Sequence, residues 1–385
     1  MHRWLFFALC LNFFASCGHS DKGTGFTTDE KEEADLQHVE VSFEKAHFSG
    51  WPANFGIWQW GSEILVGFDK GYHKDLGPTM HNIDRDKPEQ TLFARSLDGG
   101  ETWTIEDPSV DGILVARGSS LHGTEPAYPN RVEPSHLKEQ INFRHPDFAM
   151  TLRFLDYNTG PSLLYYSYDR GHHWKGPFNL SVSGRSDILA RTDYIVLDRH
   201  SCLAFLSVSK EDHEEGRPIC AITHDGGLTW ELLSMIGPEP TGFAIMPSTV
   251  RLSDSTYITT LRRREDDHRW IDAWRSDDAG LNWQILDPPV DNLGEGNPPC
   301  LIKLKDGRLC LTYGVRAEPY RIASKFSSDE GKHWSEEKVL RADGAGRDIG
   351  YVRSVQRPDG KIVTTYYFQD HNRPERYIAA TIWQP

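Results

Sequence analysis

The sequence lacks long apolar runs, an excess of basic charge and helical periodicity. Beyond the N-terminus no apolar stretch approaches about 18 residues, and the mean hydropathy is −0.55, which together exclude a polytopic membrane protein. The 385 residues carry 56 acidic and 42 basic side chains, a formal net charge of −14, without a long basic block. Sequence-independent binding to nucleic acid is therefore not expected.

Cysteine is scarce, and the cysteines do not have the spacing of a zinc-binding site. Of the 6 cysteines, two lie near the N-terminus, and no CxxC pair or His/Cys cluster has the spacing of a metal site. We therefore assign no metal-binding residue and predict no cofactor; the sequence does not decide whether a metal binds elsewhere. The other cysteines lie in apolar strand-like runs, which favours buried free thiols over two disulfides, although an exported protein could form both. These residues are Cys202, Cys220, Cys300 and Cys310.

Residues 1–17 are typical of an export signal. A basic start and an apolar stretch over residues 4–14 precede two small residues and Cys17. This order resembles a bacterial lipobox, so we predict that Cys17 is lipidated and anchors the protein to a bacterial envelope membrane, periplasmic or at the cell surface. An ordinary cleaved signal is the alternative. Residues 18–37 are polar and unpatterned, which predicts a flexible tether.

Five segments repeat the pattern Ser/Thr-x-Asp-x-Gly-x-x-Trp, with tryptophans 51 to 71 residues apart. We call these segments the Asp boxes: residues 96–103, 167–174, 223–230, 276–283 and 327–334. The Ser/Thr and Asp oxygens can accept hydrogen bonds from turn amides, glycine supplies a positive φ, and tryptophan packs the corner of a hairpin. The aspartates of the boxes are therefore predicted to be structural and not catalytic.

Short strand-like runs bounded by turn signals, such as RLCLTYG and KIVTTYYF, fill the chain between the boxes. A repeat of roughly 50 residues suits one four-stranded blade of a β-propeller. Five boxed units and a last unit without a box predict an all-β, six-bladed propeller over residues 38–385. The last unit supplies only three strands, so residues 38–46 are predicted to close the ring as its fourth. Residues 109–142 are an insertion without an assigned structure.

A six-bladed propeller with several Asp boxes resembles the sialidase superfamily, over about residues 40–385. The resemblance implies a site on the face opposite the boxes, built from the loops between second and third strands and from the blade connections. The sequence places many arginine, histidine and tyrosine side chains on those segments. Arginine binds carboxylate or sulfate, and histidine and tyrosine transfer protons. An acidic oligosaccharide is the expected ligand, and no protein partner is predicted.

Several residues match the sialidase pattern one by one. In GYVRS, Tyr351 corresponds to the sialidase nucleophile, and Arg321 corresponds to the third arginine of the carboxylate-binding triad. TLRRRED offers Arg262 or Arg263 for the second arginine, and we take Arg263. The Arg-Ile-Pro motif that carries the first arginine of the triad is absent, and ANFGIW takes its place. The expected glutamate is also missing, and Arg251 lies near its position. Without that glutamate Tyr351 has no evident activating base.

The predicted site combines these matches with other groups on the same loops. The candidate catalytic residues are Tyr351, His81 and His145. The candidate substrate-binding residues are Arg191, Tyr194, Arg263, Asn297, Arg316 and Arg321.

Three functions fit this set of residues. The favoured one is elimination on uronate-containing oligosaccharides, by a dehydratase or lyase, since the residues resemble those of propeller enzymes that degrade ulvan-type polysaccharides. Arginine would neutralise the carboxylate while histidine and tyrosine exchange protons. The alternatives are a sialidase-like exo-glycosidase and a non-enzymatic glycan-binding propeller. A hydrolase would need a carboxylate pair, for which the sequence offers Asp84, Asp86 and Asp348.

The lipid anchor is testable by substitution of Cys17. Cys17→Ser removes the thiol that would carry the lipid, so the variant should move from the membrane fraction to the soluble fraction. Fractionation of expressing cells checks this. Membrane association that is unchanged in the variant would contradict the lipoprotein prediction.

Overall fold

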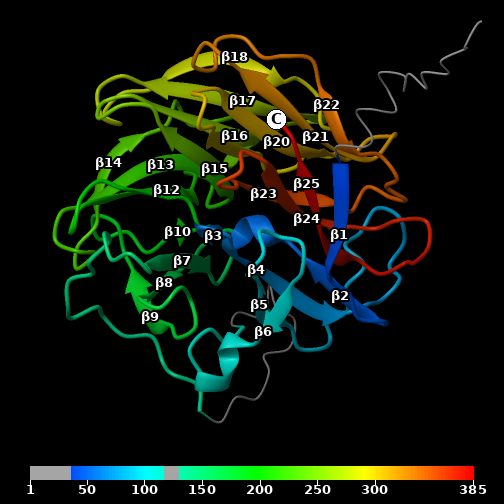
Figure 1. The fold of residues 1–385 in the computed structure, drawn as a ribbon. Helices are drawn as coiled ribbons and strands as arrows, with labels where there is room; N and C mark the ends of the chain where they lie inside the picture. Colours follow the sequence, from blue (N-terminus) through cyan, green and yellow to red (C-terminus); the bar gives the residue numbers. More distant parts are fainter. Residues whose placement is uncertain (1–35, 117–129) are drawn as a thin grey trace, which may run out of the picture. The chain divides into compact units, whose positions relative to one another are not determined.

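The computed structural model describes residues 36–116 and 130–385. The predicted export signal, and all of the tether except its last two residues, lie outside the described residues. Over the described ranges, six antiparallel sheets form a ring with one sheet per blade (Figure 1). The predicted all-β, six-bladed propeller is confirmed.

The blades follow each other in chain order. The first blade has β2 (His47–Gly50), β3 (Ile57–Trp60), β4 (Glu63–Tyr72), β5 (Gln90–Ser96) and β6 (Thr104–Glu106); the second has β7 (Ala149–Phe154), β8 (Ser162–Ser167) and β9 (Lys175–Leu180); the third has β10 (Ile188–Leu189), β11 (Tyr194–Val196), β12 (Cys202–Ser209), β13 (Glu215–Thr223) and β14 (Glu231–Met235). The fourth has β15 (Phe243–Arg251), β16 (Tyr257–Glu265), β17 (His268–Ser276) and β18 (Gln284–Val290); the fifth has β19 (Cys300–Lys303), β20 (Leu309–Val315), β21 (Arg321–Ser327) and β22 (Lys338–Arg341). The sixth has β23 (Gly350–Gln356), β24 (Ile362–Phe368), β25 (Tyr377–Trp383) and β1 (Leu36–Ser42).

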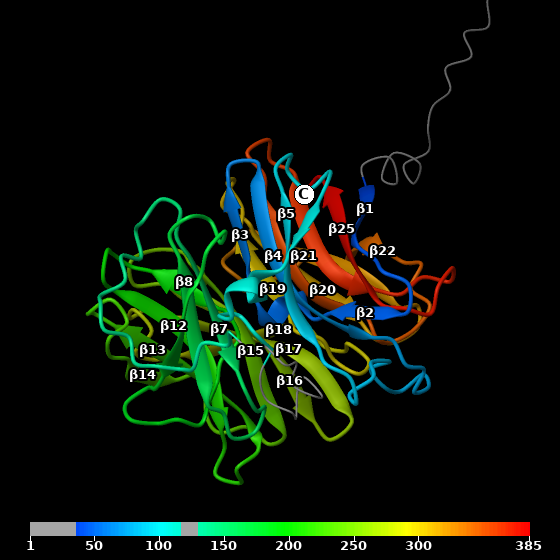
Figure 2. The same ribbon diagram turned by 90° about the horizontal axis from the view of Figure 1, so that it is seen from below.

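The middle strands of the blades are buried on both faces because neighbouring blades pack against each side (Figure 2). β12 (CLAFLSVS) and β25 (YIAATIW) are buried along their whole length. Such strands are apolar without alternation, which is why the sequence shows them as continuous runs. The largest apolar cluster joins the second blade to the third, through residues such as Met150 and Leu206.

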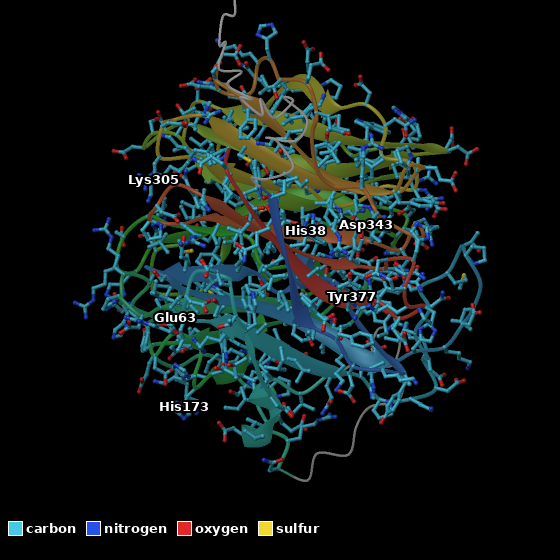
Figure 3. All side chains as sticks on the ribbon, turned by 45° about the vertical axis from the view of Figure 1, so that its right-hand side comes forward. His38, Glu63, His173, Lys305, Asp343 and Tyr377 are labelled. Atoms are coloured by element: carbon cyan, nitrogen blue, oxygen red, sulfur yellow. The ribbon has the colours of Figure 1, made fainter. Side chains whose placement is uncertain are left out.

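The N-terminal strand closes the ring as the outermost strand of the sixth blade. β1 pairs antiparallel with β25, from Leu36 opposite Trp383 to Ser42 opposite Ile378. His38, labelled with Tyr377 in Figure 3, also bonds through its Nδ1 to Thr381 Oγ1 at 3.0 Å. The pairing confirms the predicted closing strand, which begins two residues earlier than expected and ends at Ser42.

The five Asp boxes fold alike. In each, the glycine amide donates to the Ser/Thr hydroxyl at 2.7–2.9 Å, and an amide four residues past the aspartate donates to its Oδ1 at 2.9 Å. In the first box, burial would raise the pKa of Asp98, but hydrogen bonds from Thr102, Ser96 and Glu101 lower it to about 2. These carboxylates are occupied in holding turns, as predicted.

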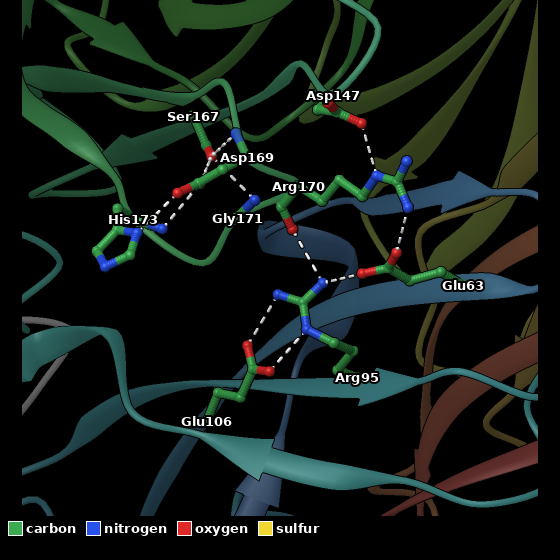
Figure 4. A network of polar contacts seen from close by, with 9 residues as sticks. All are labelled: Glu63, Arg95, Glu106, Asp147, Ser167, Asp169, Arg170, Gly171 and His173. Carbon is green, nitrogen blue, oxygen red and sulfur yellow. Dashed lines mark hydrogen bonds and ion pairs between the residues drawn. The ribbon is translucent and has the colours of Figure 1, made fainter.

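Ion pairs tie the first blade to the second beside a box (Figure 4). Arg95 on β5 binds Glu63 at 2.6 Å and Glu106 at 2.6 Å. Arg170 of the second box reaches the same Glu63 at 2.8 Å and Asp147 at 2.6 Å. The buried Arg95 is thus compensated from both sides, and the two blades share one carboxylate.

The second blade departs from the four-strand pattern. The described residues give it three strands, and the buried run AMTLRF of β7 begins just after FRHPDF. Residues 143–148 (FRHPDF) therefore lie at the N-terminal end of β7, next to the second box. There Asp147 forms an ion pair with Arg170. The loop on the opposite face is residues 155–161. The predicted insertion is described only over 109–116 and 130–142.

The four cysteines of the propeller are buried free thiols, as expected from their apolar surroundings. Burial raises the pKa of each. Among the described residues, no helix is long and apolar enough to span a membrane.

The tryptophans of the boxes should be structural. Trp230 is 5% exposed within the cluster between the second and third blades. Trp230→Ala should lower the free energy of unfolding by about 3–5 kcal/mol through lost burial and a cavity, as measured by denaturant titration. Activity per folded molecule should persist. A folded variant without turnover would contradict the assignment of the boxes to the structural face.

Candidate active site

A cavity of about 290 Å³ opens where the inner strands converge, on the face opposite the Asp boxes. It is lined by Trp51, Asn54, Asp69, His81, Arg85, Arg153, Phe154, Tyr157, Arg191, Glu215, Phe243, Ile245, Arg262 and Tyr351. The first, second, third, fourth and sixth blades all contribute. Aromatic walls with a few converging charged groups are typical of a small-ligand site.

The inner strands are irregular where they reach the cavity. Trp51 (φ 59°), Met246 (φ 55°) and Tyr351 (φ 50°) adopt the left-handed conformation, which is uncommon for bulky residues. Met246 and Tyr351 lie at bulges of β15 and β23. Such strain persists only where the surrounding structure imposes it, and it clusters at functional sites.

His81 reaches the cavity from the loop between β4 and β5 and is held by Asp348. Its Nδ1 lies 2.6 Å from Asp348 Oδ1, and its ring meets Trp51 edge-on at 5.3 Å. Because a carboxylate accepts hydrogen bonds, Nδ1 carries a proton, and the lone pair of the neutral imidazole is then on Nε2. The neutral imidazole is therefore oriented to accept a proton at Nε2.

Asp348 is fully buried and surrounded by donors. Tyr367 donates its hydroxyl to Oδ1 at 2.5 Å, Arg376 Nε lies 3.2 Å from Oδ2, and Arg316 Nη2 lies 4.0 Å from Oδ1. Burial alone would raise the pKa of Asp348, but His81, Arg376 and Arg316 hold it well below its usual range. The carboxylate stays charged wherever the protein is folded near neutral pH.

Tyr351 is positioned from behind by Asn297. The fully buried Asn297 accepts the Tyr351 amide at 2.9 Å and donates to the Ile349 carbonyl at 3.0 Å. A Cβ on Gly350 would lie 2.4 Å from the Asn297 side chain, so only glycine fits there. Arg262 Nη1 donates to the Tyr351 hydroxyl at 3.3 Å. Because the Tyr351 oxygen is the acceptor in this bond, its hydroxyl proton can be donated to another group.

Two cavity arginines are paired with carboxylates that also line the cavity. Arg153 Nη2 lies 3.6 Å from Asp69 Oδ1, and Arg191 binds Glu215. Arg153 is buried against the Phe55 ring, 3.5 Å from its centroid. These pairs hold two charges of each sign at the cavity wall.

Arg85 and Arg262 have different surroundings. Arg85 lies over the Trp51 ring and pairs with the buried Glu89, whose pKa is raised by burial to about 7. Arg262 has no carboxylate partner among the described residues, and its Nε makes no hydrogen bond there. Burial lowers the pKa of Arg262, and the positive charges of Arg316 and Arg191 lower it further. An anion in the cavity would relieve this repulsion.

The described residues contain no cluster of three or more His, Cys, Asp or Glu side chains arranged to hold a metal ion. The donor set of the cavity is arginine, histidine, tyrosine and paired carboxylates. Those groups suit an anionic organic ligand.

Of the sequence-predicted residues, three line the cavity: His81, Arg191 and Tyr351. Two others lie directly behind Tyr351, where Asn297 holds its backbone and Arg316 lies 5.5 Å from its ring centroid. Arg316 itself is buried and donates to the Ile349 carbonyl and the Tyr367 hydroxyl.

Four predicted residues lie elsewhere. His145 is on the box side, tilted against Tyr168. Tyr194 is buried, and its hydroxyl accepts a hydrogen bond from Trp58. Arg321 pairs with Glu337.

Arg263 is the fourth, and strand parity explains its position. Successive residues of β16 point to opposite faces, so Arg262 faces the cavity and Arg263 pairs with Asp272 at 3.0 Å over the Trp270 ring.

Sequence reasoning missed most of the cavity wall, including Asp69, Arg85, Arg153, Tyr157 and Glu215. It named Asp84 and Asp86 as candidate carboxylates, but these bind Lys74 at 3.0 and 3.1 Å and do not line the cavity. An arginine inside the otherwise apolar run AMTLRF was the one available signal, since a buried arginine needs a functional or ionic reason.

Residues 156–364, more than half of the chain, match the model of the BNR repeat-like domain. The chain belongs to this family. No curated protein matches the sequence of this BNR propeller. Solved structures match its fold, which is that of the sialidase superfamily.

Three solved structures illustrate the match. A protein of unknown function from Dyadobacter fermentans is 18% identical with a TM-score of 0.67, covering 91% of this chain and 99% of that one. The NanB sialidase of Streptococcus pneumoniae is 12% identical with a TM-score of 0.58, covering 89% and 70%. An α-L-arabinanase of Penicillium chrysogenum is 12% identical with a TM-score of 0.54, covering 91% and 98%.

The link from Asp348 to His81 should be essential for turnover. Asp348→Asn can no longer hold the Nδ1 proton as a carboxylate does, so kcat should fall by about 10²–10⁴-fold. Asp370→Asn is the matched control, because Asp370 is a buried carboxylate of the same region that accepts from Tyr377 at 2.7 Å away from the cavity. Equal losses of activity in both variants would contradict the role of Asp348.

The stability of Asp348→Asn relative to wild type should depend on pH. The folded pKa of Asp348 lies below its ordinary value of 3.8, so its stabilising effect is present above about pH 4 and is lost on acidification below it. The difference in unfolding free energy between wild type and Asp348→Asn should therefore shrink below about pH 4.

Proposed function

We propose that this BNR propeller is a carbohydrate-active enzyme that eliminates across a carbon–carbon bond of a uronic acid unit in an acidic oligosaccharide. The observation that carries the proposal is Arg262, a guanidinium that faces the cavity without a carboxylate partner among the described residues. A substrate carboxylate supplies the missing charge. Its binding there would bring the adjacent C–H into the cavity that His81 and Tyr351 also line.

Two groups are suited to the proton transfers. His81 has its Nδ1 proton engaged by Asp348, which leaves Nε2 to accept a proton. The Tyr351 hydroxyl accepts a hydrogen bond from Arg262, so its own proton is available to donate. The positive charge of Arg262 then stabilises the phenolate that forms when Tyr351 gives up this proton. A hydroxyl–carboxylate pair nearby, Tyr367 with Asp348, is buried and keeps the Asp348 carboxylate in place behind His81.

The reaction balances without an external reagent. His81 removes the proton from the carbon that bears the carboxylate, and that electron pair forms a C=C bond to the next carbon. The bond from this second carbon to its oxygen breaks, and the Tyr351 hydroxyl protonates the departing oxygen. Water or a sugar alcohol leaves, and solvent returns the proton from His81 to Tyr351. Arg262 stabilises the charge that grows on the carboxylate.

Hydrolysis is the second candidate. Asp69 and Glu215 both line the cavity and could form the carboxylate pair that most glycosidases use. The sialidase and arabinanase folds are compatible with it. Each carboxylate is paired with an arginine, however, and Tyr351 contacts Arg262 where a sialidase-like nucleophile would need a base.

We also propose that the protein is attached to a membrane. A lipid on Cys17 would hold the exported propeller at a membrane of the bacterial cell envelope, periplasmic or at the cell surface, where acidic oligosaccharides would reach it.

The product that the protein forms from acidic oligosaccharides distinguishes elimination from hydrolysis. Elimination yields an unsaturated uronate that absorbs ultraviolet light, with one water lost or with fragments whose masses sum to the substrate. Arg262→Met should weaken the reaction by about 10- to 100-fold in kcat/KM, because it removes a charge-assisted contact to the carboxylate.

Arg263→Met is the matched control, since its side chain faces Asp272 and not the cavity. It should retain near wild-type kcat/KM if it folds, which a melting curve checks. Release of a saturated sugar acid without absorbance would refute elimination and favour hydrolysis.

A further inference from the structure

Tyr157 presents an exposed aromatic ring at the edge of the cavity. Its ring lines the cavity and is 44% exposed, an unusual exposure for a large aromatic side chain. Among residues 36–116 and 130–385, it stacks on no other aromatic ring and its hydroxyl has no hydrogen-bond partner. The other aromatic residues of the lining pack against neighbours, such as Trp51 against Phe48 at 4.8 Å.

The backbone presents Tyr157 rigidly. On one side, Asp156 Oδ1 accepts the amides of Asn158 and Thr159 at 2.9 Å each. On the other, Asn158 Oδ1 accepts the Glu215 amide at 3.2 Å, and its carbonyl accepts the Ser209 hydroxyl. The loop of the second blade is therefore fixed to the third blade at the residue that pairs with Arg191. An exposed ring on so constrained a loop is preorganised for a ligand.

On the side of the propeller opposite Tyr157, side-chain contacts join the loops at the edge of the cavity. Arg347, in the connection between the fifth and sixth blades, donates to the Thr79 carbonyl at 2.7 Å and pairs with Glu295. This joins the loop that carries His81 to the connection between the fourth and fifth blades. In a ring of six, the fifth blade is opposite the second, so among the described residues the exposed ring of Tyr157 offers a longer ligand a path away from this closed side.

The cavity volume, about 290 Å³, lies at the lower end of the range for small-ligand pockets. It suits one sugar ring with its carboxylate. We infer that Tyr157 forms a second subsite, on which the sugar next to the uronate stacks its apolar C–H face. The substrate is then an oligosaccharide of at least two units and not a free sugar acid. This inference rests on the proposed function.

Binding to a catalytically impaired protein tests the subsite apart from the chemistry. In the Tyr351→Phe background, titration calorimetry compares glucuronic acid with a glucuronate-containing tetrasaccharide. The tetrasaccharide should bind about 3- to 10-fold more tightly, the range expected for one aromatic stacking contact. Adding Tyr157→Ala should remove that advantage, and Tyr157→Phe should restore it, because the ring and not the hydroxyl makes the contact.

Tyr72→Ala is the matched control, since Tyr72 is 38% exposed and does not line the cavity. It should keep the tetrasaccharide advantage. Equal affinity for both sugars, or an advantage that survives Tyr157→Ala, would overturn the subsite while leaving the proposed function standing. If neither sugar binds, and Arg262→Met changes nothing, the proposed function fails and the subsite fails with it.

Discussion

The fully buried carboxylate of Asp348 constrains the whole site. A buried charge is stable only where neighbouring charges and donors compensate it, and here Arg316, Arg376, Tyr367 and His81 do so together. Removing Asp348 would leave the buried Arg316 and Arg376 without this counter-charge. The group therefore fixes the loop that carries His81 against the sixth blade, and it sets which imidazole nitrogen faces the cavity.

The propeller makes this arrangement possible because its inner strands converge from six directions. Two inner strands, β15 and β23, leave regular pairing near the cavity, and the left-handed residues Trp51 and Tyr351 lie there in the first and sixth blades. The boxes at the opposite face hold the blade corners with identical hydrogen bonds, so the irregular ends can vary. The boxes stabilise one end of five blades, and the cavity lies at the opposite end, where the first, second, third, fourth and sixth blades contribute to it.

The sequence predicted the architecture well because the boxes are local motifs with a local cause. The closing strand followed from counting strands in the last unit. Side-chain placement was harder. Choosing Arg262 over Arg263 requires the parity of β16, and the position of His145 depends on β7 beginning at Ala149. Tyr157 belongs to no motif, and only the fold brings it to the cavity.

The proposed elimination requires that groups in the cavity remove the proton next to a bound carboxylate. The fate of that hydrogen tests it directly. A uronate-containing oligosaccharide carrying deuterium at the carbon next to the carboxylate is converted by the protein, and the product is weighed. Elimination predicts a product that has lost the deuterium to water. A product that retains the deuterium, with one water added across the cleaved bond, would contradict the account and identify a hydrolase.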